Sequence, residues 1–288
     1  MGLWVPVDAF SFATDNAGAT YTGTGVGTQI TAGGTNHTKN ATITSLLAGS
    51  AITQDCYWIT IGFFAGSSSG ASRRFLTDIY FDPAGGTSWE SAPRIPNLAA
   101  NTPDYVQGGV WYGFPIYIKN GTSIGAACQA ETASSTVRVV VAVTGRPSRP
   151  TILEAGTRVV AYGATTASTV GTTVTPGATG SMGSYSSSLG TTSADHWWWQ
   201  TGILFSDTTQ TAVQYWFDMA IGDANRKYVV QRGLLHTNVG TVEQAGRANF
   251  SGIYYPAYAQ ASGASVFVRG VCTGTADSSC SAIVYGLV

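Results

Sequence analysis

Two stretches of this chain, 115–145 and 256–286, carry the same turn and strand signals in the same order. Each opens with a proline, continues through a glycine turn into a strand, and closes with an apolar strand that leads to a glycine. Corresponding residues lie about 141–144 positions apart by subtraction, as at Pro115 and Pro256. One matching turn arises easily by chance, but a whole series at one offset indicates internal duplication.

The first of these stretches predicts three antiparallel strands. Ile116–Ile118 leads into Asn120-Gly121, a pair that suits the two positive-φ positions of a tight hairpin turn, and 123–129 follows as the return strand. The third strand, 137–143, has valines at period two on one face and further apolar residues on the other. A strand that is apolar on both faces is expected at the centre of its sheet.

The duplication extends over most of the chain. Val26-Gly27-Thr28 recurs as Val170-Gly171-Thr172, and the aromatic stretch 55–64 corresponds to 195–204 with Asp, Trp and Gly aligned. Each half contains short apolar segments separated by Gly, Pro and Ser/Thr clusters, which is typical of all-β proteins. We therefore expect an all-β fold with two tandem antiparallel jelly-roll-like β-sandwich domains related by internal duplication.

The expected domain boundaries follow from the repeat and from the proline- and arginine-containing stretch TGRPSRPTI in the middle of the chain. They are an N-terminal arm over 1–25, a first β-sandwich repeat over 26–148, a linker and entry strand over 149–169, and a second β-sandwich repeat over 170–288.

The chain carries few charges. Charged residues make up 10% of its 288 residues, against about 25% in an average soluble domain. The formal net charge is −1, so we expect neither nucleic-acid binding nor attraction to acidic membranes. No apolar run approaches the roughly 18 residues of a membrane span, and residues 1–12 lack the pattern of a signal peptide. Such a surface favours burial in an assembly, and the alternative is a Ser/Thr-rich wet surface.

Residues that often carry catalysis are present without a recognised motif. Asp195-His196 lies near many serines, which suggests a hydrolase, but no G-x-S-x-G nucleophile elbow occurs. The position of His196 is taken by Cys56 in the first half, so the repeats do not share its chemistry. We therefore expect no catalytic residues and no enzymatic activity.

Metal and cofactor sites are not expected either. The histidines lack metal-binding spacings, and the cysteines form no C-x-x-C pair, so all four are expected to be buried thiols, although Cys272 and Cys280 could face each other in a final hairpin. Calcium needs several oxygen ligands, whereas each loop offers one or two acids. We expect these acids to be exposed in loops: Asp78, Asp82, Asp218 and Asp223.

The densest aromatic cluster consists of three consecutive tryptophans. In a strand, Trp197 and Trp199 share one face and Trp198 has the other. If Trp198 is a core residue like its counterpart Trp58, then Trp197 and Trp199 are open to a neighbouring subunit or a sugar ring. Trp4, in the apolar N-terminal arm, is a third candidate contact. Core aromatic residues should agree between the two halves, whereas functional ones should differ.

The repeated elements have a recognisable order: an aromatic strand, the strand FLTDIYF, IPNL, PIYIKNGTSIGAACQ and a closing valine strand. This order resembles β-sandwich virion proteins of tailed bacteriophages, of the tail-fibre or decoration type. The first half carries the resemblance well, and the second departs with AYAQA in place of IYIKN. The resemblance implies a location in the virion after synthesis in the host cytoplasm. It also implies homo-oligomers, other virion proteins as partners, and no catalytic residues or cofactors.

The function expected from these observations is that of a non-enzymatic, exterior tail or fibre-associated protein. It would assemble with neighbouring subunits and contact the host surface, with a surface glycan as a candidate ligand. Three alternatives stay open: a capsid decoration (cement) protein, a carbohydrate-binding module, and a hydrolase that uses His196 or loop acids.

Overall fold

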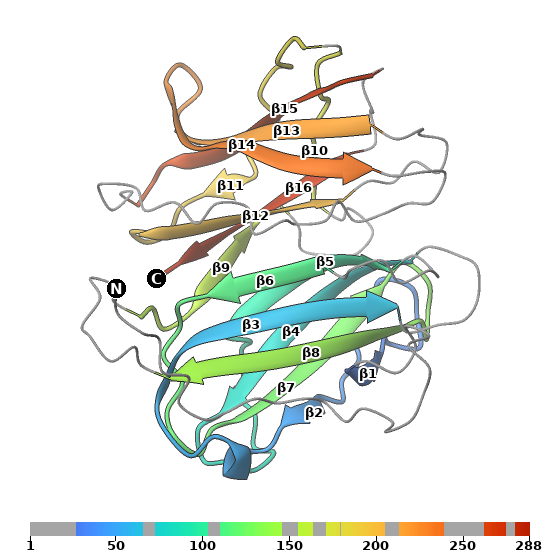
Figure 1. Ribbon diagram of the computed structural model, residues 1–288, viewed down its shortest axis with the longest axis vertical. Helices are drawn as coiled ribbons and strands as arrows, with labels where there is room; N and C mark the ends of the chain where they lie inside the picture. The colour runs from blue at the N-terminus through green and yellow to red at the C-terminus, as the bar shows by residue number, and fades with distance from the viewer. Residues whose placement is uncertain are drawn as a thin grey trace, which may run out of the picture.

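The computed structural model describes residues 27–65, 73–102, 110–145, 155–163, 171–178, 180–204, 213–238, 262–274 and 280–288. The expected arm, 1–25, and Trp4 within it lie outside these ranges. Within them the chain is all-β, apart from a short 3₁₀ helix, η1, at Gly49–Ala51. No described helix has the length and apolar character needed to cross a membrane. Figure 1 shows two β-sandwiches, one above the other.

The first sandwich packs two four-stranded antiparallel sheets face to face. The front sheet has the order β1 (Thr28–Thr31), β8 (Thr136–Gly145), β3 (Cys56–Ala65) and β6 (Val110–Phe114). The back sheet has the order β2 (Thr44–Leu47), β7 (Ser123–Ala130), β4 (Arg73–Asp82) and β5 (Ile95–Thr102). β8 pairs with both β1 and β3, which confirms that the valine strand is central.

The second sandwich has the same construction. Its junction sheet contains β10 (Thr172–Thr173), β16 (Ser281–Leu287) and β12 (Trp198–Leu204), and β9 (Val159–Tyr162) also pairs with β16. Its outer sheet has the order β11 (Gly190–Thr191), β15 (Ser265–Cys272), β13 (Val213–Gly222) and β14 (Lys227–Asn238). The entry strand expected before the second repeat corresponds in position to β9.

The strand order confirms the internal duplication. β1, β8 and β3 of the front sheet correspond to β10, β16 and β12, and the back sheet matches the outer sheet strand for strand. The register of β4 shifts between Thr77 and Ile79, and that of β13 shifts between the corresponding Phe217 and Met219. The chain repeatedly crosses between facing sheets, as in a jelly roll. The fold is therefore two tandem antiparallel jelly-roll β-sandwiches.

The prediction of a hairpin around Asn120-Gly121 is wrong, because the segments on either side of this turn do not pair with each other. The turn exists, with Gly121 at a φ of 81°, but Ile116 and Ile118 form only isolated bridges with distant segments. The expected return strand, β7, pairs with β2 and β4 in the back sheet, whereas β8 lies in the front sheet. β7 and β8 follow one another in the sequence but lie in facing sheets, so they cannot pair as a hairpin.

The two sandwiches meet where the first one has open strand edges. β5 and β6 end their sheets on the same side, and β9 and β12 lie against β5. Tyr285 of β16 accepts a hydrogen bond from the Ala99 N–H at 2.9 Å and donates to the Asn97 carbonyl at 2.9 Å. The Gly113 N–H of β6 donates to Oε1 of Gln200 at 3.3 Å. Side chains of the junction sheet thus satisfy edge groups that would otherwise lack partners.

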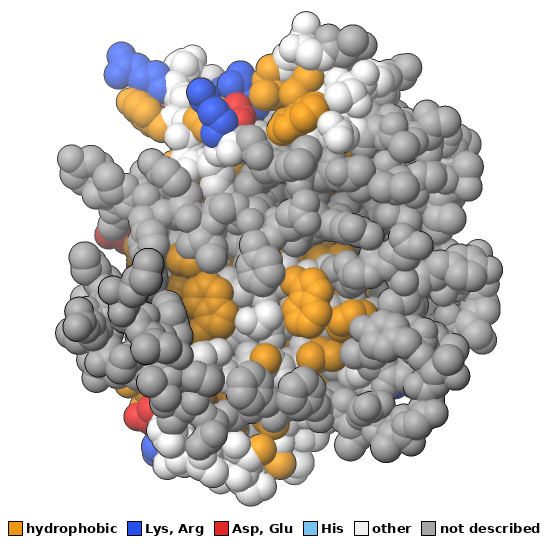
Figure 2. Space-filling model, viewed as in Figure 1, with side chains coloured by type: hydrophobic (Ala, Val, Ile, Leu, Met, Phe, Trp, Pro, Cys, Tyr) orange, Lys and Arg blue, Asp and Glu red, His pale blue; other side chains and the backbone are white. Residues whose placement is uncertain are grey.

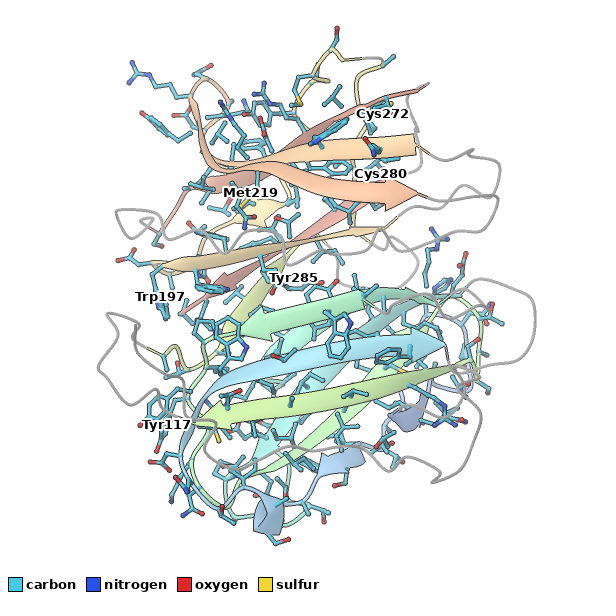
Figure 3. The ribbon with its side chains drawn as sticks, in the orientation of Figure 1. Tyr117, Trp197, Met219, Cys272, Cys280 and Tyr285 are labelled. Carbon is cyan, nitrogen blue, oxygen red and sulfur yellow. The ribbon has the colours of Figure 1, made fainter. Side chains whose placement is uncertain are left out.

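Apolar packing at this junction is continuous with the first core. Trp198 and Tyr285 belong to the same buried cluster as the first sandwich, and Figure 3 shows Tyr285 between the two sandwiches. The Trp198 ring meets Trp58 edge-on at 5.5 Å between centroids, and Tyr285 meets Tyr112 edge-on at 5.4 Å. The second sandwich has a further core of its own, which includes Met219. The halves therefore share a core at the junction.

We predict that Tyr285→Phe destabilises the whole chain. The substitution keeps the ring but leaves the buried Ala99 N–H without its acceptor, which costs about 1–3 kcal/mol. Urea unfolding should show a lower midpoint with an unchanged slope. The matched control is Tyr117→Phe, because Tyr117 is 39% exposed and its hydroxyl contacts Asp55 at the surface. Equal midpoints for the two variants would contradict this account of the junction.

Candidate functional site: an aromatic sheet face beside the junction

The three consecutive tryptophans lie at the junction, but not as predicted. Trp198 is buried with 1% exposure and faces the first sandwich. Trp199 is also buried at 1%, inside the second core, with its ring 4.7 Å from His196. The prediction that Trp199 is open to a partner is therefore wrong, because the Trp199 face of β12 packs into the second core and the Trp198 face meets the first sandwich. Trp197 is partly buried against the junction, at whose margin Figure 3 shows it.

His196 is a buried structural residue in this arrangement. Its Nε2 lies 2.6 Å from the Tyr162 hydroxyl, and its Nδ1 lies 3.3 Å from the Leu287 carbonyl. A neutral imidazole with the proton on Nδ1 satisfies both contacts, donating to the carbonyl and accepting from the hydroxyl. Burial lowers the pKa of His196 below its ordinary value of 6.5, so the fold favours this neutral form. His196 therefore connects β9 to β16.

We predict that His196 makes the fold sensitive to acid. Because its pKa is lower in the folded state, the unfolded chain binds more protons as the pH falls below about 6.5. Stability should therefore decrease on acidification, by at most about 1.4 kcal/mol per pH unit from this group. In His196→Gln the free energy of unfolding should vary less between pH 7 and pH 5, measured by urea titration. An unchanged pH dependence would show that His196 does not contribute.

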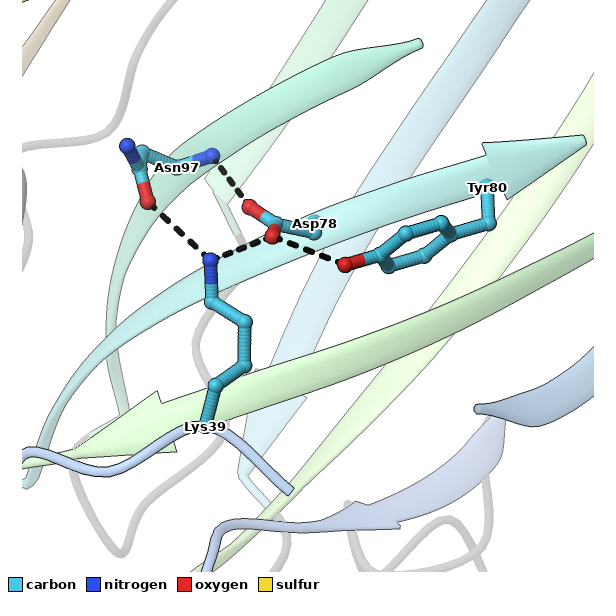
Figure 4. A network of polar contacts seen from close by, with 4 residues as sticks. All are labelled: Lys39, Asp78, Tyr80 and Asn97. Atoms are coloured by element: carbon cyan, nitrogen blue, oxygen red, sulfur yellow. Dashed lines mark hydrogen bonds and ion pairs between the residues drawn. The ribbon is translucent and has the colours of Figure 1, made fainter. Parts of the chain in front are cut away.

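Asp78, expected in an exposed loop, lies instead within β4 and is 2% exposed. Figure 4 shows its partners: the Lys39 ammonium forms an ion pair with it, the Asn97 N–H donates to Oδ1 at 2.8 Å, and the Tyr80 hydroxyl donates at 3.2 Å. Burial and the neighbouring carboxylate raise the pKa of Tyr80 to about 12, so its hydroxyl stays protonated. Asn97 has a φ of 53°, a conformation that asparagine tolerates better than most residues.

The other expected loop acids also have structural partners. Asp218, the counterpart of Asp78, is 2% exposed and pairs with Arg269 at 3.1 Å. Asp82 is 2% exposed and accepts hydrogen bonds from N–H groups of the turn that follows it, as at Gly86. Asp223 is exposed, as expected, and caps its own turn. Among the described residues, no cluster of three or more His, Cys, Asp or Glu could hold a metal ion.

The four cysteines of the chain are buried. Cys56, Cys128 and Cys272 are free thiols, which agrees with the prediction for these three, and Cys280 is likewise buried. Burial is the main reason that the pKa of Cys56 rises to about 11 and that of Cys128 to about 12. The thiols of Cys56 and Cys128 are therefore poor nucleophiles at neutral pH.

The outer face of the front sheet carries two half-buried tryptophans that pack on glycines. A Cβ placed on Gly62 would lie 2.6–2.8 Å from three successive ring atoms of Trp111, so this indole lies flat over the backbone of β3. The Trp58 indole approaches Gly113 of β6 with its edge: the nearest ring atom lies 2.7 Å from the Cβ position, and the next two lie 3.3 and 3.5 Å away. Figure 2 shows hydrophobic side chains gathered at the centre of the view, where Figure 1 places β3, β6 and β8.

This face was missed by the sequence reasoning, although a signal for it existed. When the repeats are aligned at Pro115 and Pro256, Trp111 corresponds to Gly252 and Gly113 corresponds to Tyr254. Trp111 thus meets the criterion of an aromatic residue that differs between the halves. Trp198, by contrast, matches Trp58 and lies in a shared core. The candidate functional site is therefore the face formed by Trp111, Trp58 and the small residues between them.

Comparisons with known proteins show no family for this chain. No protein-family model matches it, and no curated protein does. The tandem CBM22-1–CBM22-2 domains of Paenibacillus barcinonensis Xyn10C align over 99% of this chain and 98% of that one, with 11% identity and a TM-score of 0.29. The viral major capsid protein STIV MCP aligns over 91% and 96%, with 9% identity and a TM-score of 0.30. Likenesses this distant carry no argument about function.

Proposed function

We propose that this protein is a non-enzymatic structural component of a tailed-phage particle, an exterior tail or fibre-associated protein that assembles with neighbouring subunits. The observation that supports the proposal is the junction, where Tyr285 and Gln200 of one sandwich complete the open strand edges of the other. Separating the sandwiches would expose Trp198 and leave backbone groups of β5 unpaired. The chain is thus a stiff two-domain block, which suits a part that holds its position in a particle.

The composition supports the same proposal. A chain with 10% charged residues has few groups that keep an isolated surface solvated. Burial of apolar surface between neighbouring subunits would stabilise an assembly by about 25 cal/mol per Å². The apolar residues Leu3, Trp4 and Val5 make the N-terminal arm the proposed anchor.

We predict that the protein is recovered with purified particles and self-associates in solution. Particles would be dissociated into heads and tails, and the protein quantified in each fraction by mass spectrometry. Recovery with tails is the expected result, whereas recovery with heads would assign the protein to capsid decoration. Light scattering of the purified chain should give a stable trimer or larger assembly. A soluble 29.9 kDa monomer that is absent from particles would contradict the proposal.

The anchor is tested by deleting residues 1–12. Because the deletion removes an apolar segment but none of the described strands, the variant should fold and yet fail to enter particles. Circular dichroism and urea unfolding of the variant serve as the control for folding. Normal incorporation of the shortened chain would show that the anchor lies elsewhere.

A further inference from the structure

We propose that the outer face of the front sheet is a binding platform for a linear, neutral polysaccharide, with Trp111 as its central stacking residue. This inference deepens the proposed function, because an exterior virion protein that contacts its host needs a surface of this kind. It depends on the proposed function only for the place where the protein would meet the glycan. Its test uses purified protein and oligosaccharides, so either proposal can fail while the other stands.

The Trp111 indole lies face-on against the backbone of β3. The distances from the Cβ position of Gly62 to three successive ring atoms of Trp111 are 2.6, 2.7 and 2.8 Å. Distances this similar require that the ring faces the glycine and does not point its edge at it. One face of the indole therefore packs on the backbone, and the opposite face points away from the sheet. Phe64 meets the same ring edge-on, at 5.5 Å and 87°, and helps to hold its orientation.

The surroundings of the ring form a flat floor with a polar margin. Gly62 pairs with Val140, and Thr60 pairs with Ala142, so the centre of the face consists of small side chains. Trp58 lies toward the junction, and its indole N–H donates to the Thr60 hydroxyl at 3.0 Å, which fixes the ring. The margin toward β1 is polar, because the side chains of Gln29 and Thr31 are exposed there.

This combination favours a sugar chain. A pyranose ring presents apolar C–H groups on its faces and hydroxyls around its edge, so it can cover an indole face and still reach polar groups at the margin. The charged described side chain of this face is Arg138, whose Nη1 already donates to the Gly27 carbonyl at 3.0 Å. A neutral chain therefore fits better than an anionic one.

Comparison of the two repeats favours a glycan over a second copy of the protein. The corresponding face of the junction sheet does dock on protein, and there Gln200 and Tyr285 supply the hydrogen bonds that strand edges need. The register places Thr60 and Ala142 at these positions in the front sheet, and neither side chain has that reach. A face without such groups suits a ligand that brings its own hydroxyls, since unpaired edge groups would otherwise be buried.

The experiment is calorimetric titration of the full-length protein with cellohexaose, xylohexaose, mannohexaose and chitohexaose. We expect at least one to bind with Kd below about 1 mM. Trp111→Ala should weaken that binding about tenfold or more, the factor that corresponds to losing about 1.4 kcal/mol. Gly62→Ala keeps the indole but places a methyl group 2.6 Å from it, so the ring must lift and binding should also weaken.

Trp89→Ala is the matched control. Trp89 also packs on a glycine of the first sandwich, because a Cβ on Gly125 would lie 2.7 Å from its ring. Trp89 lies between β4 and β5, and this glycine belongs to β7 of the opposite sheet, where Ile43 also covers it. This variant should bind like the unmodified protein. If Trp111→Ala does not fold, Gly62→Ala carries the test.

Three results would overturn the proposal. The first is that none of the four hexasaccharides binds below about 1 mM. The second is that Trp111→Ala and Gly62→Ala bind as tightly as the unmodified chain, or that Trp89→Ala loses binding equally. The third is that Trp111→Ala lowers the assembly mass measured by light scattering and leaves glycan binding unchanged, which would make this face a subunit interface.

Discussion

The packing of the two sandwiches depends on two open strand edges of the first one, those of β5 and β6. A jelly roll ends each sheet in a strand whose outer N–H and C=O groups lack a ladder partner, and such edges invite association with other chains. Here the edges of β5 and β6 meet the second sandwich, and Tyr285 bonds to both Asn97 and Ala99. The cost of leaving these groups buried and unpaired explains why the two repeats form one body.

Duplication then allowed the same sheet face to take two forms. In the second repeat the face carries Gln200 and Tyr285, which reach into the neighbouring sandwich. In the first repeat the equivalent positions are Thr60 and Ala142, and the same face carries Trp111, whose indole lies flat on Gly62. One scaffold thus yields a protein-docking face and a flat aromatic face, and the difference lies in a few outward-pointing side chains.

Much of the architecture could be predicted from the sequence. Two tandem sandwiches and a central β8 were predicted from the offset repeat, the period-two valines of 137–143 and the turn clusters. These signals are local in the sequence, and the same series occurs in both halves. Less of the candidate site could be predicted. Asp78 was expected in an exposed loop, yet β4 extends through it and Lys39 pairs with it.

The sequence by itself determined the all-β class, the duplication and the alternation that places Trp198 and Trp199 on opposite sides of β12. The tertiary structure alone decided which side of β12 meets the first sandwich, which strands pair, and which tryptophan lies flat on the outer face of a sheet. The physical reason is that burial and edge hydrogen bonds depend on elements distant in sequence. Trp111 stays half-buried because β3 offers it Gly62, a contact that appears only once β6 lies beside β3.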